Sequence, residues 1–196
     1  FLAVLVLWRL VHEAKPAEAK PSSATAEGSH EGGFSLRFKL LLVVLLLFAL
    51  GNSSDAFLIL RAQNLGMSVV YILLVMAAFN MVSAALATPA GTLSDKIGRS
   101  RLILAGWGVY ALVYLGFAVA GAAWQVIPLF LAYGFYYAAA DGAGRALVAD
   151  MVPAARRGTA YGLYNTAVGI TAFPASLIAG WLWQAVSPAA PFYFGA

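Results

Sequence analysis

Three ionisable residues lie inside long apolar runs of the sequence, where a charge is costly. Asp55 follows a run of leucines and valines, and Asp141 and Arg145 lie four residues apart in a later run. A carboxylate in such surroundings can take up and release a proton or pair with a cation. If the later run is a helix, Asp141 and Arg145 share one face and can form an ion pair. These three residues are therefore the candidates for charge-based chemistry.

Each candidate also has a structural interpretation. The pair of Asp141 and Arg145 can serve only to stabilise helix packing. At 1.5 Å per helical residue, Asp141 lies about 14 Å from Asp150, near the middle of a membrane core of about 30 Å. By the same arithmetic Asp55 lies about 24 Å from Lys39, in the outer third of such a core. Asp55 is thus a proton-binding carboxylate, an outer-gate residue, or an interfacial residue reached by water.

Neutral polar residues in the apolar runs offer hydrogen bonds to a solute. Tyr133 and Tyr137 continue the stripe of Asp141 at the same spacing, so they lie on one helical face. Most such residues only hold helices together, which leaves a structural alternative for each. The candidates for lining a solute cavity are Asn52, Asn80, Tyr133, Tyr137, Tyr161 and Asn165.

The composition indicates lipid surroundings for these runs. The chain has 196 residues, of which 62% are hydrophobic and 10% charged, whereas a soluble domain has about 25% charged residues. A domain of this size still exposes about 30% of its chain surface, so such an apolar chain needs lipid around it. The formal net charge is +4, but the basic residues form no stripe, so we expect no nucleic-acid partner. The main predicted partner is the lipid bilayer.

Reactive side chains are few. The chain has no cysteine, and its two histidines, His12 and His30, lie in or beside a polar stretch. We therefore expect no metal site and no Ser–His pair within the membrane. A phosphate-binding Gly-x-x-x-x-Gly-Lys loop is also missing from the sequence. These observations predict that the chain is not an enzyme and uses no cofactor.

Hydropathy divides the chain into an all-α, polytopic transmembrane helical bundle and a linker. We expect residues 1–12 to be the end of a preceding transmembrane helix. Residues 13–36, rich in Glu, Lys, Ser, Pro and Gly, predict a flexible loop. Residues 37–196 form the predicted bundle, with another span starting at residue 190. A span needs about 20 mostly apolar residues, and the complete candidates are 37–60, 68–90, 101–122, 125–149 and 158–186.

Basic residues divide unequally between the two ends of these spans. If successive connections alternate sides, ten of the twelve Lys and Arg residues fall on one side and only Arg61 on the other, with Arg145 inside a span. The positive-inside rule then places the basic side, including the 13–36 loop, in the cytoplasm. We expect a multi-pass protein of the plasma (inner) membrane.

The connection between the second and third predicted spans carries a distinctive pattern, GTLSDKIGRSRLI over residues 91–103. Gly91 lets two helices approach closely, and Gly98 permits a tight reversal. Asp95 can cap the following helix or pair with a basic neighbour. Basic residues would hold the connection on the inner face.

This pattern resembles the signature loop of the major facilitator superfamily, which reads Gly, any, Leu, small, Asp, basic, any, Gly, Arg, basic, any, any, aliphatic. The sequence departs from it at Ser100, where a second basic residue is usual. It matches at Gly91, Leu93, Ser94, Asp95, Lys96, Gly98, Arg99 and Ile103.

The resemblance implies a fold and an activity. In this family the motif follows the second helix and is echoed after the eighth, and the 13–36 loop resembles the central cytoplasmic loop. The five spans then correspond to helices seven to eleven of an incomplete C-terminal six-helix half, whose partner is the missing N-terminal half. The third span would face lipid.

The activity implied is that of a secondary transporter moving a small-molecule substrate by alternating access. Protons would be coupled through Asp55 or Asp141, with facilitated diffusion left open. A transporter-like membrane receptor or scaffold without flux is the alternative.

Overall fold

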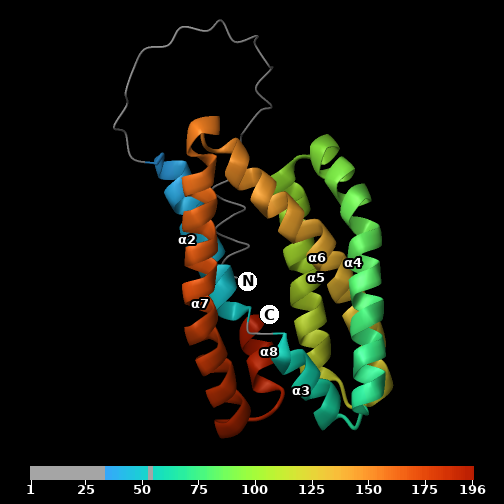
Figure 1. Ribbon diagram of the computed structural model, residues 1–196. Helices are drawn as coiled ribbons and strands as arrows, with labels where there is room; N and C mark the ends of the chain where they lie inside the picture. Colours follow the sequence, from blue (N-terminus) through green and yellow to red (C-terminus); the bar gives the residue numbers. More distant parts are fainter. Residues whose placement is uncertain (1–33, 53–54) are drawn as a thin grey trace, which may run out of the picture.

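A computed structural model describes residues 34–52 and 55–196, except for the side chain of Asp141. Every element in this part is helical, which confirms the all-α prediction (Figure 1). The predicted segment 1–12 and nearly all of the 13–36 loop lie outside the described residues. The elements are α2 (Leu36–Gly51), α3 (Ala56–Asn64), α4 (Val69–Ile97), α5 (Arg99–Val119), α6 (Ala123–Asp150), the 3₁₀ turn η1 (Ala154–Arg156), α7 (Arg157–Ala185) and α8 (Ala190–Gly195).

Four stretches are long and apolar enough to cross a membrane, and the first of them includes residues 53–54, which lie outside the description. They are Leu36–Asn64, Val69–Ile97, Arg99–Val119 and Ala154–Ala185. Helix α6 has 28 residues and is not one of these four stretches. It corresponds to the span predicted at 125–149.

The first predicted span is two helices instead of one. The stretch at 37–60 was expected to be continuous, whereas α2 ends at Gly51 and α3 begins at Ala56. The intervening residues include Asn and Asp, whose side chains compete for backbone hydrogen bonds and disfavour helix interiors. The Tyr110 hydroxyl donates to the Gly51 carbonyl at 3.1 Å, which satisfies an oxygen at the end of α2.

The signature segment is mostly helix, where a loop was expected. Helix α4 continues through Ile97, and α5 begins at Arg99. Gly98 alone separates them, with φ +93°, a conformation that favours glycine. The role expected for Gly91 does not hold within the described residues, because a Cβ there would meet nothing within 4 Å.

Helix α6 lies at the centre of the bundle, against α5 on one side and α4 on the other, while α2 lies against α7 (Figure 1). Helices α4 and α6 are in close contact at Gly134, where an added Cβ would lie 3.0 Å from the Phe79 carbonyl oxygen. Helix α8 fits between α5 and α7.

Helix α5 does not match the lipid-facing role implied for the third span. Half of its most apolar stretch is buried, against 17–19% for the other three candidate spans. Its aromatic side chains point inward, because Trp107, Tyr110, Tyr114 and Phe117 are all buried. A shortage of strongly polar residues therefore did not indicate a lipid-facing helix.

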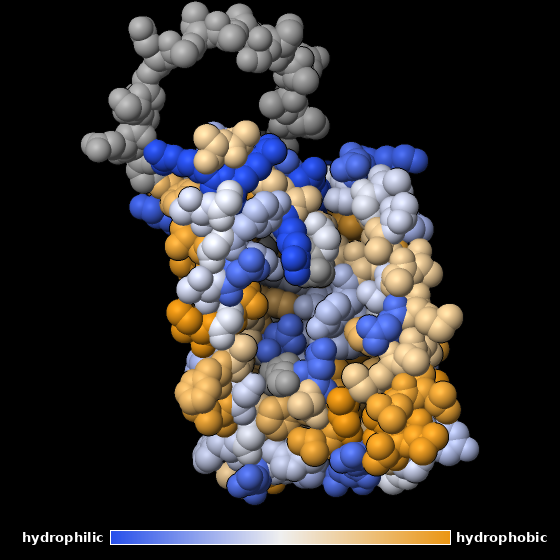
Figure 2. All heavy atoms as spheres, in the orientation of Figure 1, coloured by the Kyte–Doolittle hydropathy of each residue, from blue (hydrophilic) through white to orange (hydrophobic). Residues whose placement is uncertain are grey.

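Large apolar side chains are exposed along α4 and α7. They give apolar edges to the face shown in Figure 2, while hydrophilic residues gather around a hollow in its middle. Exposed apolar faces of this extent suit contact with lipid or with further helices. The most exposed examples are Val70, Leu73, Leu74 and Met81 on α4, and Ile170, Phe173, Leu177 and Trp181 on α7.

Candidate functional site

The Asp55 carboxylate lies between the two helices of the broken first span and faces α6. The Tyr133 hydroxyl donates to Oδ1 at 2.8 Å, and the Tyr137 hydroxyl donates to Oδ2 at 3.0 Å. The two tyrosines are one helical turn apart, so the predicted stripe on α6 does present both to one partner. Three of the predicted candidates thus meet in one place, although the sequence did not indicate that Asp55 and the tyrosines are partners.

Asn52 joins this group from the end of α2. Its Nδ2 donates to the Tyr136 hydroxyl at 3.4 Å, and its Oδ1 accepts from the Tyr114 hydroxyl at 3.4 Å. Neither Tyr114 nor Tyr136 was among the predicted site residues. Tyr110 and Tyr114 do show the four-residue spacing that drew attention to α6, but they lie on the span that was expected to face lipid.

We call Tyr110, Tyr114, Tyr133, Tyr136 and Tyr137 the tyrosine cluster. Its rings touch: the centroids of Tyr110 and Tyr114 are 4.1 Å apart, and those of Tyr133 and Tyr136 are 5.3 Å apart. Tyr137 and Asp55 are half-buried, whereas the other four tyrosines are buried. The carboxylate and Tyr137 therefore form the accessible edge of a buried aromatic group.

The remaining candidates for the cavity do not join this site. Asn80 is exposed and donates to the Met76 carbonyl of its own helix at 2.8 Å. Asn165 is exposed on α7. The Tyr161 hydroxyl donates to the Arg145 carbonyl at 3.3 Å, so it joins α7 to α6. The pairing predicted for Asp141 and Arg145 stays a prediction, because the Asp141 side chain lies outside the description.

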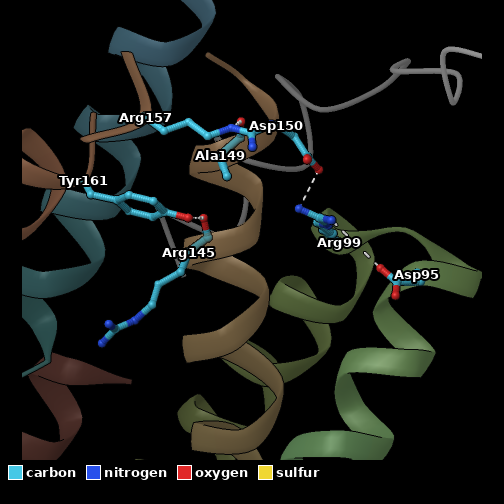
Figure 3. A network of polar contacts seen from close by, with 7 residues as sticks. All are labelled: Asp95, Arg99, Arg145, Ala149, Asp150, Arg157 and Tyr161. Atoms are coloured by element: carbon cyan, nitrogen blue, oxygen red, sulfur yellow. Dashed lines mark hydrogen bonds and ion pairs between the residues drawn. The ribbon is translucent and has the colours of Figure 1, made fainter. Parts of the chain in front are cut away.

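A second polar group lies at the end of the bundle that carries the signature segment, which we call the signature end (Figure 3). Arg99 Nη1 lies 2.6 Å from Asp150 Oδ2 at the end of α6, and Arg99 Nη2 lies 3.9 Å from Asp95 Oδ1. Of the two roles expected for Asp95, the structure shows pairing, and α5 has no side-chain cap bond. Lys96 and Leu93 are exposed. Asp150 was missed, since nothing in the sequence relates it to Arg99.

Helix α7 also holds α6 at this end. Arg157 Nε donates to the Ala149 carbonyl at 3.2 Å, where the last carbonyls of α6 have no helical donor. The Arg145 side chain points away from the Arg99–Asp150 pair (Figure 3). The signature end therefore joins α4, α5, α6 and α7 through side chains that solvent reaches.

Arg61 holds the opposite end, which we call the Arg61 end. Its Nε donates to the Phe117 carbonyl at 3.1 Å, and its Nη2 donates to the carbonyls of Ala118 at 3.4 Å and Ala120 at 2.9 Å. These oxygens lie at the C-terminus of α5, where a positive charge is favourable. The sequence had suggested only an isolated basic residue on the sparsely charged side.

Comparison with known proteins points to the same family that the signature segment resembles. The family model of the Major Facilitator Superfamily matches residues 40–196. The chain is also 40% identical, over 163 residues, to an uncharacterized MFS-type transporter of Methanocaldococcus jannaschii. That alignment covers 80% of this chain and 41% of the relative, so the chain spans less than half of the relative's length. With a helical bundle of spanning length and a family model matching most of its residues, the chain belongs to the major facilitator superfamily of membrane transporters.

Proposed function

We propose that this chain supplies the C-terminal half of a secondary transporter that moves a small solute by alternating access and couples it to protons at Asp55. The observation that carries the proposal is the carboxylate held by Tyr133 and Tyr137 inside a spanning segment. A partner half of similar size would complete the transporter, in line with a relative more than twice as long.

Asp55 suits proton exchange because of where it lies. Asp55 is half-buried, so a proton can reach its carboxylate from water while the buried tyrosines keep its inner side dry. Adding a proton removes a charge from a spanning segment, which changes the cost of closing the site around it. The two hydroxyls can rotate, so they can serve as donors to the anion and as acceptors for the neutral acid.

Alternating access also requires a closed end of the transporter that can open, and the signature end suits this role. Its ion pairs are solvent-exposed and cost little to break.

We place this end in the cytoplasm, because it carries the excess of basic residues. Since these 196 residues contain no cysteine, Ser100→Cys gives a single labelling site once any cysteine in the rest of the full-length protein is replaced by serine. We expect a membrane-impermeant maleimide to label it in everted vesicles and not in right-side-out ones; the reverse would contradict this orientation.

The experiment that tests the function uses everted vesicles containing the full-length protein. A proton gradient is read with a pH-sensitive dye while a panel of organic solutes is added. We expect one class of solute to dissipate the gradient, Asp55→Asn to remove the response, and Glu27→Gln, a carboxylate lost from the 13–36 loop, to keep it.

Two results would count against this proposal. An undiminished response in Asp55→Asn would show that protons are coupled at another residue. Asp141→Asn would then be the next variant to test. If no solute dissipated the gradient, proton coupling would fail. Uptake of labelled solute would then separate facilitated diffusion from a receptor or scaffold without flux.

A further inference from the structure

We propose that the Asp55 site binds an organic cation, of the ammonium or phosphonium type, as the solute of this transporter. The inference rests on the proposed function and names its substrate class. Asp55 places a carboxylate in a spanning segment, and among the described residues it forms no ion pair. The described donors to its carboxylate oxygens are two neutral phenols. A cation that enters this part of the spanning segment meets an opposite charge there.

The described side chains that donate to the carboxylate are aromatic and pack against a further ring. Phe79 on α4 stacks on Tyr133 with ring centroids 5.6 Å apart and is roughly perpendicular to Tyr137 with centroids 5.3 Å apart. The face of an aromatic ring attracts a cation, most strongly where water is excluded. A carboxylate at the edge of such a group offers charge and ring surface together, and an organic cation can use both.

The described positive charges nearest in sequence are engaged elsewhere. Arg61, six residues after Asp55, is buried against α5 carbonyls. Arg145 follows Tyr137 by eight residues, about 12 Å along α6 at 1.5 Å per residue, and it has interactions of its own. Among the described side chains, the other titratable groups in contact with the site are the phenols of the tyrosine cluster. The side chain of Asp141, one turn beyond Tyr137 on α6, lies outside the description. The described structure thus leaves the charge of Asp55 to be balanced by a proton or by a cationic solute.

An inorganic ion fits these surroundings poorly. Small hard cations take about six oxygen ligands in a compact shell, and no group of three or more His, Cys, Asp or Glu side chains occurs in the described part of the chain. Aromatic rings supply no such ligands. The chemistry therefore favours a larger cation with apolar surface.

The test uses the purified full-length protein and two probes of matched shape and opposite charge. Binding of tritiated tetraphenylphosphonium is measured by scintillation proximity, and unlabelled tetraphenylphosphonium and tetraphenylborate compete for it. We expect the cation to compete at least about tenfold better than the anion. Equal competition, or better competition by the borate, would overturn the proposal without any variant being needed.

Variants then locate the site. We expect Asp55→Asn to weaken tetraphenylphosphonium binding at least about tenfold, and Asp55→Glu to restore it to within about threefold. We expect Tyr137→Phe to weaken binding less than Asp55→Asn does. Its matched control is Tyr71→Phe, which changes an exposed tyrosine of α4. Undiminished binding in an Asp55→Asn protein that melts normally would overturn the assignment.

The two proposals can fail separately. Proton-coupled flux of a neutral or anionic solute, with no tetraphenylphosphonium binding, would refute the substrate class and leave the transporter intact. Charge-selective binding that requires Asp55, without proton coupling, would uphold the site and refute the coupling.

Discussion

The two ends of the group formed by α3 to α6 are held by opposite kinds of charged contact. At the signature end, Arg99 and Asp150 pair with 28% and 52% of their side-chain surface exposed. At the Arg61 end, a guanidinium that is 9% exposed bonds to backbone carbonyls. Exposed ion pairs contribute little and can break and re-form, whereas a buried, fully bonded cation is costly to disturb. The comparison indicates that the contacts at the signature end are easier to break than those at the Arg61 end.

The strongest test of this comparison removes the Arg61 guanidinium. Arg61→Met keeps much of the side-chain length but leaves the α5 carbonyls without donors, and we expect it to lower the free energy of unfolding by about 2–4 kcal/mol. Arg101→Met, at an exposed position near the signature end, should change it by less than about 0.5 kcal/mol. Thermal unfolding in detergent measures both. Equal effects of the two substitutions would remove the contrast between the ends.

A smaller effect is expected where α4 and α6 touch between the two ends. Gly134→Ala pushes a methyl group against the Phe79 carbonyl and Val82, both within 3.2 Å of it, and should destabilise the protein by about 1–3 kcal/mol. Gly142→Ala, on the same helix with nothing within 4 Å, should be neutral or stabilise by up to about 1 kcal/mol. The same melting experiment separates them. A neutral Gly134→Ala would show that this contact is loose.

The smallest effect belongs to the signature end. A double-mutant cycle with Arg99→Ala and Asp150→Ala should give a coupling of about 0.2–1 kcal/mol, because both side chains are partly exposed. The coupling should shrink between 0.1 M and 1 M salt, since salt screens exposed charges. A salt-independent coupling of several kcal/mol would mean that the contacts at this end are as strong as those at the Arg61 end.

Periodicity and hydropathy predicted the presence of the helices better than the residues at which the helices end or are interrupted. The spans and the family were predictable because lipid demands long apolar runs and because residues 91–103 keep a specific spacing. The break after Gly51 was not predicted, since leucines and valines precede it and an apolar stretch follows. The helical state of Asp95 and Lys96 was missed because glycine and charge were taken to indicate a loop.

The site was only partly predictable for a physical reason. Asp55, Tyr133 and Tyr137 could be chosen because each is polar in an apolar run, but spacing on one helix does not reveal the partner on another. Tyr114, Asp150 and Arg61 act through contacts with residues 51 to 62 positions away in sequence. Such pairings depend on how helices pack, which no local pattern specifies.

Proton coupling at Asp55 is tested most directly in liposomes containing the full-length protein and a solute identified in the vesicle screen. Solute exchange without a gradient is compared with accumulation driven by a pH gradient, for wild type and Asp55→Asn. We expect the variant to keep measurable exchange and to lose gradient-driven accumulation. Accumulation in Asp55→Asn equal to that of wild type would contradict the role of Asp55 in coupling.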